Sequence, residues 1–273
     1  MAASLQGVAS TGGSGSTTHT TSSTPFTSTS GGYAVITFAY DGSAPTAVTD
    51  NKGNTYTLIN SGTFGGLRFW MYGCANAVGG AGHYATITTP GNGWPSMHFA
   101  MFQGITTSPV DIRTTFNEFG QPWEIASGTL AQADEVVVAL CAFDGTGGNG
   151  QTWSDGAGFT LAAGLGDGSN YWPSALFYKV VSSTASVTAS MSTDNGPAQS
   201  AGAGMMMLSL KASAGGGGDL SVSAAQTAAA TTQTATLAAR AALSATQTAA
   251  ATTQTATLAA RASVAVCVVA AVV

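Results

Sequence analysis

The chain has 273 residues, which is enough for one large or two small domains. Only 7% of them are Asp, Glu, Lys or Arg, where about 25% is usual. The seven basic residues are scattered, so the chain lacks the Lys/Arg face that neutralises phosphates, and this argues against a nucleic-acid-binding protein. The net charge of −5 indicates no specific partner.

The two ends of the chain carry no recognisable export or membrane signal. Residues 1–5 lack the basic and apolar regions of a secretory signal peptide. The apolar run 264–273 is shorter than the roughly 20 residues that cross a bilayer. We therefore expect a protein made in a cytoplasm, with no membrane span, and exported, if at all, by another route, of which assembly into a particle before cell lysis is one.

The first part of the chain predicts short strands. Residues 1–25 are rich in Gly, Ser and Thr and predict a flexible or extended leader. Runs of β-branched and aromatic residues follow, separated by turn sequences such as Asp-Gly and Pro-Gly-Asn-Gly, which is typical of an all-β sandwich or barrel. The runs are residues 33–40, 54–60, 67–72, 84–89 and 97–103.

The strand pattern occurs twice. The sequence at 39–42, Ala-Tyr-Asp-Gly, recurs as Ala-Phe-Asp-Gly at 142–145, and Thr57-Leu58 recurs as Thr160-Leu161, in both cases 103 residues later. These repeats predict an internally duplicated, antiparallel, jelly-roll-like β-sandwich over 26–213, with halves of about 26–110 and 127–213 that bury their apolar faces against each other. We expect about ten strands in one large domain, and we regard two separate small sandwiches as the weaker alternative.

A change of composition marks the rest of the chain. Tyr178 is the last aromatic residue, and 214–219 is a Gly-rich linker. Residues 223–241 repeat almost unchanged as 244–262, within a C-terminal extension over 220–273. Paired threonines and local alternation favour strands over helices for this tail, although both remain open. Its apolar end would aggregate if left unpaired, so we expect it to assemble chains into a homo-oligomer through Val264, Val266, Val268, Val269 and Val272.

The duplicated region resembles a family of uncharacterised bacterial and bacteriophage surface and virion proteins. The resemblance rests on six segments: Val-Thr-Asp-x-x-Gly-Asn-Thr-Tyr-Thr-Leu at 48–58, Phe-Trp at 69–70, Gly-Gly at 79–80, Pro-Val-Asp at 109–111, and the closing segments at 178–183 and 210–212. It implies the sandwich fold and a role in a virion or on a cell surface. It implies no chemistry, cofactor or metal.

The residues offer little for catalysis. His19, His83 and His98 lack metal-ligand spacing, and His98 lies in an apolar run as a packing residue. The loop aspartates precede Gly or Asn, where they cap turns. Cys74, Cys141 and Cys267 do not form a disulfide framework, and their pairing stays open. The candidate ligand-binding residues are aromatic side chains near Gly/Pro-rich loops, with the plugging of the sandwich ends as the alternative: Trp94, Trp123, Trp153 and Trp172.

These observations predict a non-enzymatic structural protein of a bacteriophage virion, such as a tail-fibre-like, head-fibre or capsid decoration component. Its partners would be further copies of itself, other virion proteins and a host surface glycan. One alternative is a carbohydrate-binding adhesin at the cell surface. Another is an extracellular filament in which residues 263–273 are donated as a strand to the next subunit.

Overall fold

The computed structural model describes residues 3–13, 15–143, 152–166, 172–194 and 202–213, and two short backbone segments at 234–237 and 255–258. Every regular element within these residues is a β-strand. Ala2–Ser213 forms one compact unit, and Ala214–Val273 belongs to another together with Met1. The predicted all-β class is confirmed.

The first half of the compact unit is a sandwich of two antiparallel sheets. The five-stranded sheet has the order β1-β8-β3-β6-β5, and the three-stranded sheet has the order β2-β7-β4. The strand bounds are β1 Ser4–Gly12, β2 Thr18–Thr20, β3 Gly32–Tyr40, β4 Ala47–Asp50, β5 Thr57–Phe64, β6 Leu67–Ala77, β7 Ala85–Thr88 and β8 Ser96–Gln103.

The second half repeats this topology strand for strand. Its five-stranded sheet has the order β13-β14-β11-β16-β9, and its three-stranded sheet has the order β10-β15-β12. The bounds are β9 Ile105–Phe119, β10 Trp123–Ala126, β11 Asp134–Phe143, β12 Trp153–Asp155, β13 Thr160–Leu165, β14 Ser174–Ser182, β15 Thr188–Thr193 and β16 Gly202–Ala212. When eight is added to each strand number of the first half, the strand orders of the second half result. Each half thus has eight strands in two sheets, with the same jelly-roll-like topology.

Local irregularities are duplicated as well. The pairing of β5 with β6 has a bulge between Leu58 and Asn60, and that of β13 with β14 has one between Leu161 and Ala163, 103 residues later. Gly104 alone connects β8 of the first half to β9 of the second, and its φ of 71° is a backbone conformation that glycine adopts without strain. The predicted internal duplication is therefore present in the backbone.

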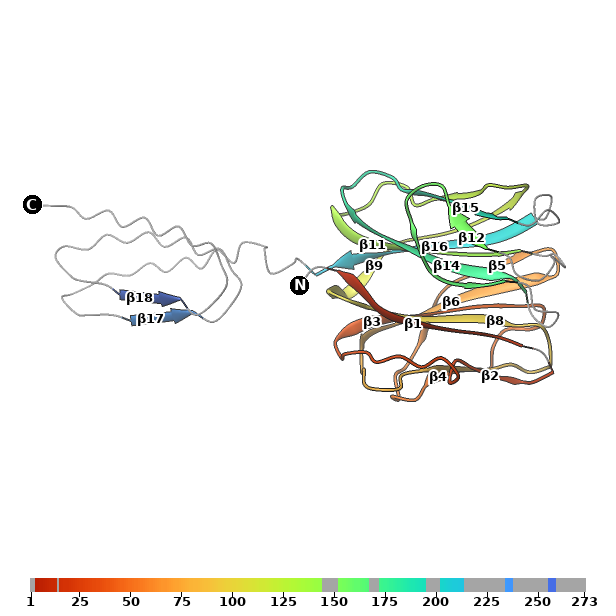
Figure 1. Cartoon of the computed structure of the whole chain (residues 1–273), viewed down its shortest axis with the longest axis horizontal. Coiled ribbons are helices and arrows are strands. Elements are labelled where there is room, and N and C mark those ends of the chain that lie inside the picture. The colour runs from red at the N-terminus through yellow and green to blue at the C-terminus, as the bar shows by residue number, and fades with distance from the viewer. Residues whose placement is uncertain are drawn as a thin grey trace, which may run out of the picture. The chain divides into compact units, whose positions relative to one another are not determined.

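The four sheets stack as layers, with the two five-stranded sheets inside and the two three-stranded sheets outside (Figure 1). Because both faces of the inner sheets are covered, β3 and β8 are buried along almost their whole length, and so are β11 and β16. Their sequences are accordingly continuous apolar runs rather than alternating ones.

Among the described residues, three separate apolar cores lie between these layers. Phe38, Ile87 and Phe99 belong to the core inside the first half, and Trp123 and Phe143 to the core inside the second. The third core joins the two inner sheets, and its members include Phe69, Leu140 and Leu208. The two halves thus bury apolar faces against each other, as the sequence predicts.

The domain boundaries differ from the expected ones. The expected leader, residues 1–25, contributes β1 and β2, and the second half begins at β9 rather than near residue 127. The expectation of about ten strands in one sandwich was wrong, because two eight-stranded sandwiches pack together. Four of the missed strands, β1, β2, β9 and β10, are edge strands, whose polar residues give no apolar run.

Only two segments of the tail are described. β17 (Thr234–Leu237) and β18 (Thr255–Leu258) occupy the same position in successive repeats and pair in parallel, in register. The five valines expected to assemble chains, Val264, Val266, Val268, Val269 and Val272, lie outside the described residues.

Candidate functional site

The two ends of the sandwich differ in what they carry. The start of β1 pairs with the end of β8, and the end of β16 pairs with the start of β9, so Ser4 and Ala212 lie at the same end, which we call the base (Figure 1). We call the opposite end the loop end, because it carries the connections 41–46, 65–66 and 89–95. The strand ends that flank 144–151, 167–171 and 195–201 also lie there.

Trp94 is the one predicted ligand-binding tryptophan with a largely exposed side chain, 45% accessible, at the loop end. Its loop is well fixed, because the Trp94 amide donates to Asp41 Oδ1 at 2.9 Å and Thr89 Oγ1 donates to the carbonyl of Gly91 at 2.9 Å. The hydroxyl of Tyr40 donates to the same carbonyl. An aromatic ring held out from a fixed loop is suited to stacking on a flat ligand face.

The other predicted tryptophans are placed differently. Trp123 and Trp153 are buried, at 0% and 5% exposure, and pack with Phe143 inside the second half. Their assignment as ligand-binding residues was wrong, because no ligand in solvent reaches either ring. Trp172 is half-buried against the core between the halves, and its Nε1 has no hydrogen-bond partner among the described residues. Trp123 and Trp153 thus pack inside the sandwich and Trp172 packs against its core, which is closer to the alternative that these rings plug the ends of the sandwich.

A buried chain of hydrogen bonds lies near the base of the first half. Ser28 Oγ is 2.7 Å from His83 Nδ1, and His83 Nε2 is 2.9 Å from Asp50 Oδ2. The Ser-His-Asp order is that of a serine hydrolase triad. Ser28 is only 3% exposed, however, and its hydroxyl accepts a hydrogen bond from the Gly80 amide at 3.3 Å. The seryl oxygen is therefore packed into the fold rather than presented to a substrate.

The duplication explains what this chain of hydrogen bonds does. Asp50 ends β4 and accepts the amides of Lys52 and Asn54, which folds the following turn. Asp155 ends the equivalent strand β12 and accepts the amides of Ala157 and Phe159 in the same way, at 2.7 and 2.8 Å. The same aspartate holds the equivalent turn in both halves, so its role is to fold that turn. His83, which is hydrogen-bonded to Asp50 in the first half, therefore stabilises the turn rather than a catalytic serine.

The electrostatics of Asp50 fit this structural role. Burial would raise its pKa, but hydrogen bonds from His83, Asn54 and Tyr56 outweigh burial and hold the pKa far below its usual range. The carboxylate is thus ionised and fully bonded. Sequence reasoning missed this network, because Ser28, Asp50 and His83 are far apart in the chain and only the fold brings them together.

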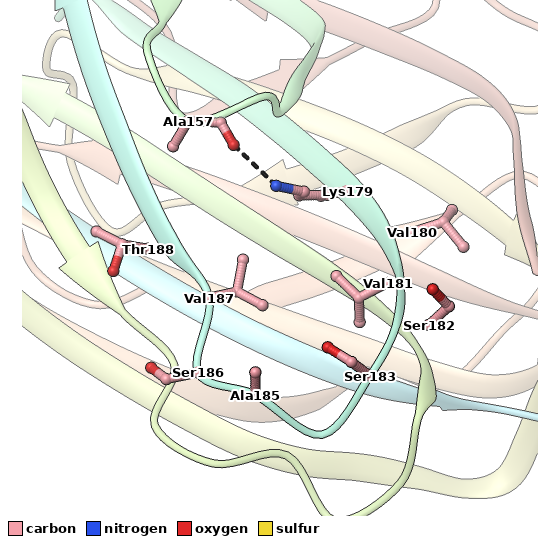
Figure 2. Close-up of a pocket in the computed structure, with 10 residues that line it drawn as sticks. All are labelled: Ala157, Lys179, Val180, Val181, Ser182, Ser183, Ala185, Ser186, Val187 and Thr188. Carbon is pink, nitrogen blue, oxygen red and sulfur yellow. Dashed lines mark hydrogen bonds between the residues drawn. The ribbon is translucent and has the colours of Figure 1, made fainter.

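A shallow hollow in the second half is lined by β14 and the loop after it (Figure 2). Lys179 lies beside it, donates to the carbonyl of Ala157 at 2.8 Å and sits over the ring of Phe159, 5.6 Å from the centroid. Small apolar and hydroxyl side chains, from valine, alanine, serine and threonine, form the remainder of the wall. The Lys179 amino group is thus engaged by Ala157 and Phe159, and the residues that line the hollow include no group suited to catalysis.

The part of the chain described by the structure contains no cluster of three or more His, Cys, Asp or Glu side chains placed to hold a metal ion. It also contains no helix long and apolar enough to cross a membrane. Cys74 and Cys141 are free thiols, and burial raises the pKa of both, with the Asp50 carboxylate adding to the effect at Cys74. Neither thiol is therefore activated as a nucleophile.

Comparison with known proteins yields no match to a family model, to a curated protein or to a solved structure.

Proposed function

We propose that this protein is a non-enzymatic structural component of a bacteriophage virion, which displays its duplicated sandwich and assembles through its C-terminal tail. The observation that carries the proposal is where the strands of the sandwich begin and end. β1 begins at the base, and β16, the last strand before the linker, ends there, opposite the loop end. An anchor at one end and exposed loops at the other suit a domain displayed on a particle.

The jelly-roll topology of each half also supports this proposal. Eight-stranded jelly rolls are frequent in viral capsid proteins and in lectins. This is an argument from fold, which by itself does not assign a task. The low charge of the chain is consistent with a surface built for packing and display rather than for catalysis.

Deleting residues 214–273 tests the role of the tail, since 2–213 is a compact unit. We expect the truncated protein to remain folded by circular dichroism and to become monomeric in light scattering, while the full chain is a homo-oligomer. A truncated protein that keeps the full oligomer mass would contradict assembly through the tail. Mass spectrometry of particles purified from the source lysate tests the location, and we expect this chain as a stoichiometric component.

A carbohydrate-binding adhesin is the second candidate, favoured by the exposed Trp94 on its fixed loop. Glycan-array binding by the intact protein that is lost in Trp94→Ala would support it. Leu58→Ala is a matched control, because Leu58 is similarly exposed, at 48%, on a different surface. An intact protein that binds no glycan would count against an adhesin.

The third candidate is a filament built by donation of residues 263–273 to a neighbouring subunit. These residues lie outside the described part of the chain, so this remains a prediction from sequence. Electron microscopy of the purified full-length protein checks it, with regular fibres as the expected result and dispersed particles as the opposing one.

A further inference from the structure

Two carboxyl side chains meet at the base of the second half. Glu135 is the second residue of β11, and Asp111 lies on the edge strand β9, where a bulge places it opposite Ser209 of β16. Glu135 is completely buried, and both Ser209 and Asp111 lie within hydrogen-bonding reach of its carboxyl group. The fold thus brings two acids from different strands together in the wall of a core.

One oxygen of this pair lacks a donor. Glu135 Oε1 accepts the amide of Gln132 at 3.3 Å, but among the described residues nothing donates to the buried Oε2. A buried oxygen without a donor beside a carboxylate is unfavourable for an ionised glutamate. It is favourable for a protonated one, because the acid can then donate a hydrogen bond to Asp111.

The charges around Glu135 favour the same state. Burial, and then the charge of Asp111, raises the pKa of Glu135, against hydrogen bonds from Ser209 and Gln132 that lower it. Its register neighbours are Lys211 on β16 and the uncharged Val181 on β14, and Lys211 forms no ion pair with it in the described structure. The covering loop over 127–133 contributes no charged residue, and Asp134 next to it is exposed.

The first half shows that the fold does not require these acids. There the corresponding loop is held by a neutral side chain, since the Thr29 amide donates to Gln6 Oε1 on β1 at 2.9 Å. In the second half, the Ala131 amide donates to Asp111 Oδ2 on β9 at 2.7 Å. The residue 103 positions before Glu135 is Gly32, where an added Cβ would lie 2.4 Å from the carbonyl oxygen of Phe102. The acid pair is therefore a feature of the second half alone.

We propose that the buried carboxyl group of Glu135 donates a hydrogen bond to Asp111, and that the two acids form a pH-responsive clasp at the base of the second half. The clasp holds residues 130–132, because Asp111 and Glu135 accept the amides of Ala131 and Gln132. The Gln132 side chain donates in turn to the carbonyl of Ala212 at 3.0 Å, next to the start of the tail. When Glu135 loses its proton, its negative charge repels Asp111. This repulsion opens the loop 130–132 and weakens the hydrogen bond between Gln132 and Ala212.

Hydrogen exchange of the full-length protein between pH 5 and pH 9, corrected for intrinsic exchange, tests the clasp. Because the acid holds its proton more tightly when the clasp is closed, protection is lost as the pH rises. We expect the open population over 127–133 and 208–213 to rise by up to about tenfold per pH unit between the ordinary glutamate pKa of the open state and the raised pKa of the closed state, and to level off above the latter. In Glu135→Gln the amide donates to Asp111 at every pH, so the open population should no longer depend on pH.

Two further variants and a second readout complete the test. Asp111→Asn also removes one of the two charges and should make the open population independent of pH. Glu124→Gln is the control and should behave like the wild type. Glu124 is exposed and accepts a hydrogen bond from Ser190 Oγ. Infrared spectroscopy should show a protonated carboxyl band that disappears in Glu135→Gln. A Glu135→Gln response equal to that of the wild type would overturn the proposal. So would a wild-type pH response abolished by Ca²⁺ or Mg²⁺, since a cation would then occupy the pair.

Discussion

His98 Nε2 lies 2.8 Å from Ser174 Oγ, a hydrogen bond that crosses from one half of the protein to the other. His98 is on β8 and Ser174 begins β14, and Ser10 Oγ lies 2.8 Å from the other ring nitrogen, Nδ1. The imidazole is completely buried in the wall between the two inner sheets, and both of its nitrogens are satisfied by hydroxyls. The expectation that His98 is a packing residue agrees with this arrangement.

This position makes the protein sensitive to acid. Burial lowers the pKa of His98 from 6.5 to about 3, with the Ser174 hydrogen bond opposing the shift. Between these values the unfolded chain takes up a proton that the folded chain does not, so stability falls as the pH falls from about 6.5 toward 3. The full effect is of the order of 4–5 kcal/mol in the free energy of unfolding.

Urea denaturation at pH 4 to 7 checks this prediction. His98→Gln keeps hydrogen-bonding atoms in the wall but does not titrate, so the difference in stability between wild type and variant should shrink as the pH falls. Carboxyl groups contribute to the pH dependence of both proteins and cancel in this difference. A constant difference from pH 7 to pH 4 would show that His98 does not carry the acid sensitivity.

Asp50→Ala should be strongly destabilising. It removes the acceptor of His83 Nε2, the Tyr56 hydroxyl and two backbone amides, and it leaves the buried His83 and the partly buried Tyr56 without this partner. We expect a loss of about 3–5 kcal/mol in the free energy of unfolding, measured by urea denaturation. Asp134→Ala, at an exposed aspartate, should change stability by less than about 0.5 kcal/mol. Comparable losses in both variants would contradict the special role of Asp50.

The tryptophans should separate into two classes. Trp123→Ala empties a fully buried site between Phe143 and Trp153 and should cost about 3–5 kcal/mol of stability. Trp94→Ala removes a ring that is 45% exposed, so it should cost about 1 kcal/mol or less in the same thermal or urea assay. The reverse order of losses would show that the burial of these rings is wrongly assigned.

The close packing of the two halves is testable at a glycine. A Cβ on Gly204 of β16 would lie 2.0 Å from the ring of Phe69 on β6, so Gly204→Ala should destabilise the protein by about 1–3 kcal/mol. Phe69→Leu in the same chain should recover part of this loss, because the two residues share one contact and their effects do not add. Gly66→Ala is the control, since an added Cβ there meets nothing within 4 Å. Fully additive losses would place the strain elsewhere.

The strands with apolar runs could be predicted from the sequence, and those with polar sequences could not. Residues 33–40 and 97–103 predict strands because both faces of β3 and β8 are buried. β9 lies at a sheet edge, and its sequence has no apolar alternation from which a strand could be predicted. Its polar residues include Asp111, Arg113, Asn117 and Glu118. The sequence predicts the 103-residue spacing of the repeat correctly. It places the start of each half too late, because the first two strands of each half are edge strands without an apolar run.

The candidate sites show the same limit. The sequence indicates that a tryptophan lies near a loop but not which way its ring points, so Trp94 and Trp123 were grouped although one is exposed and the other buried. The contacts of Asp50 with His83, and of Asp111 with Glu135, depend on strand pairing between distant segments. No sequence motif with a fixed spacing predicts that such distant residues are neighbours.

The apolar wall between the two inner sheets makes each half depend on the other. One half alone would present the side chains of Phe69, Phe102 and Leu67 to water, all of which are now completely buried. Contiguous apolar surface of this kind is a liability in a soluble monomer. A half of this kind would need a partner to cover this surface. In this chain the second half, joined through Gly104, is that partner, and the two halves differ in sequence at their base, where one carries Gly32 and the other Glu135.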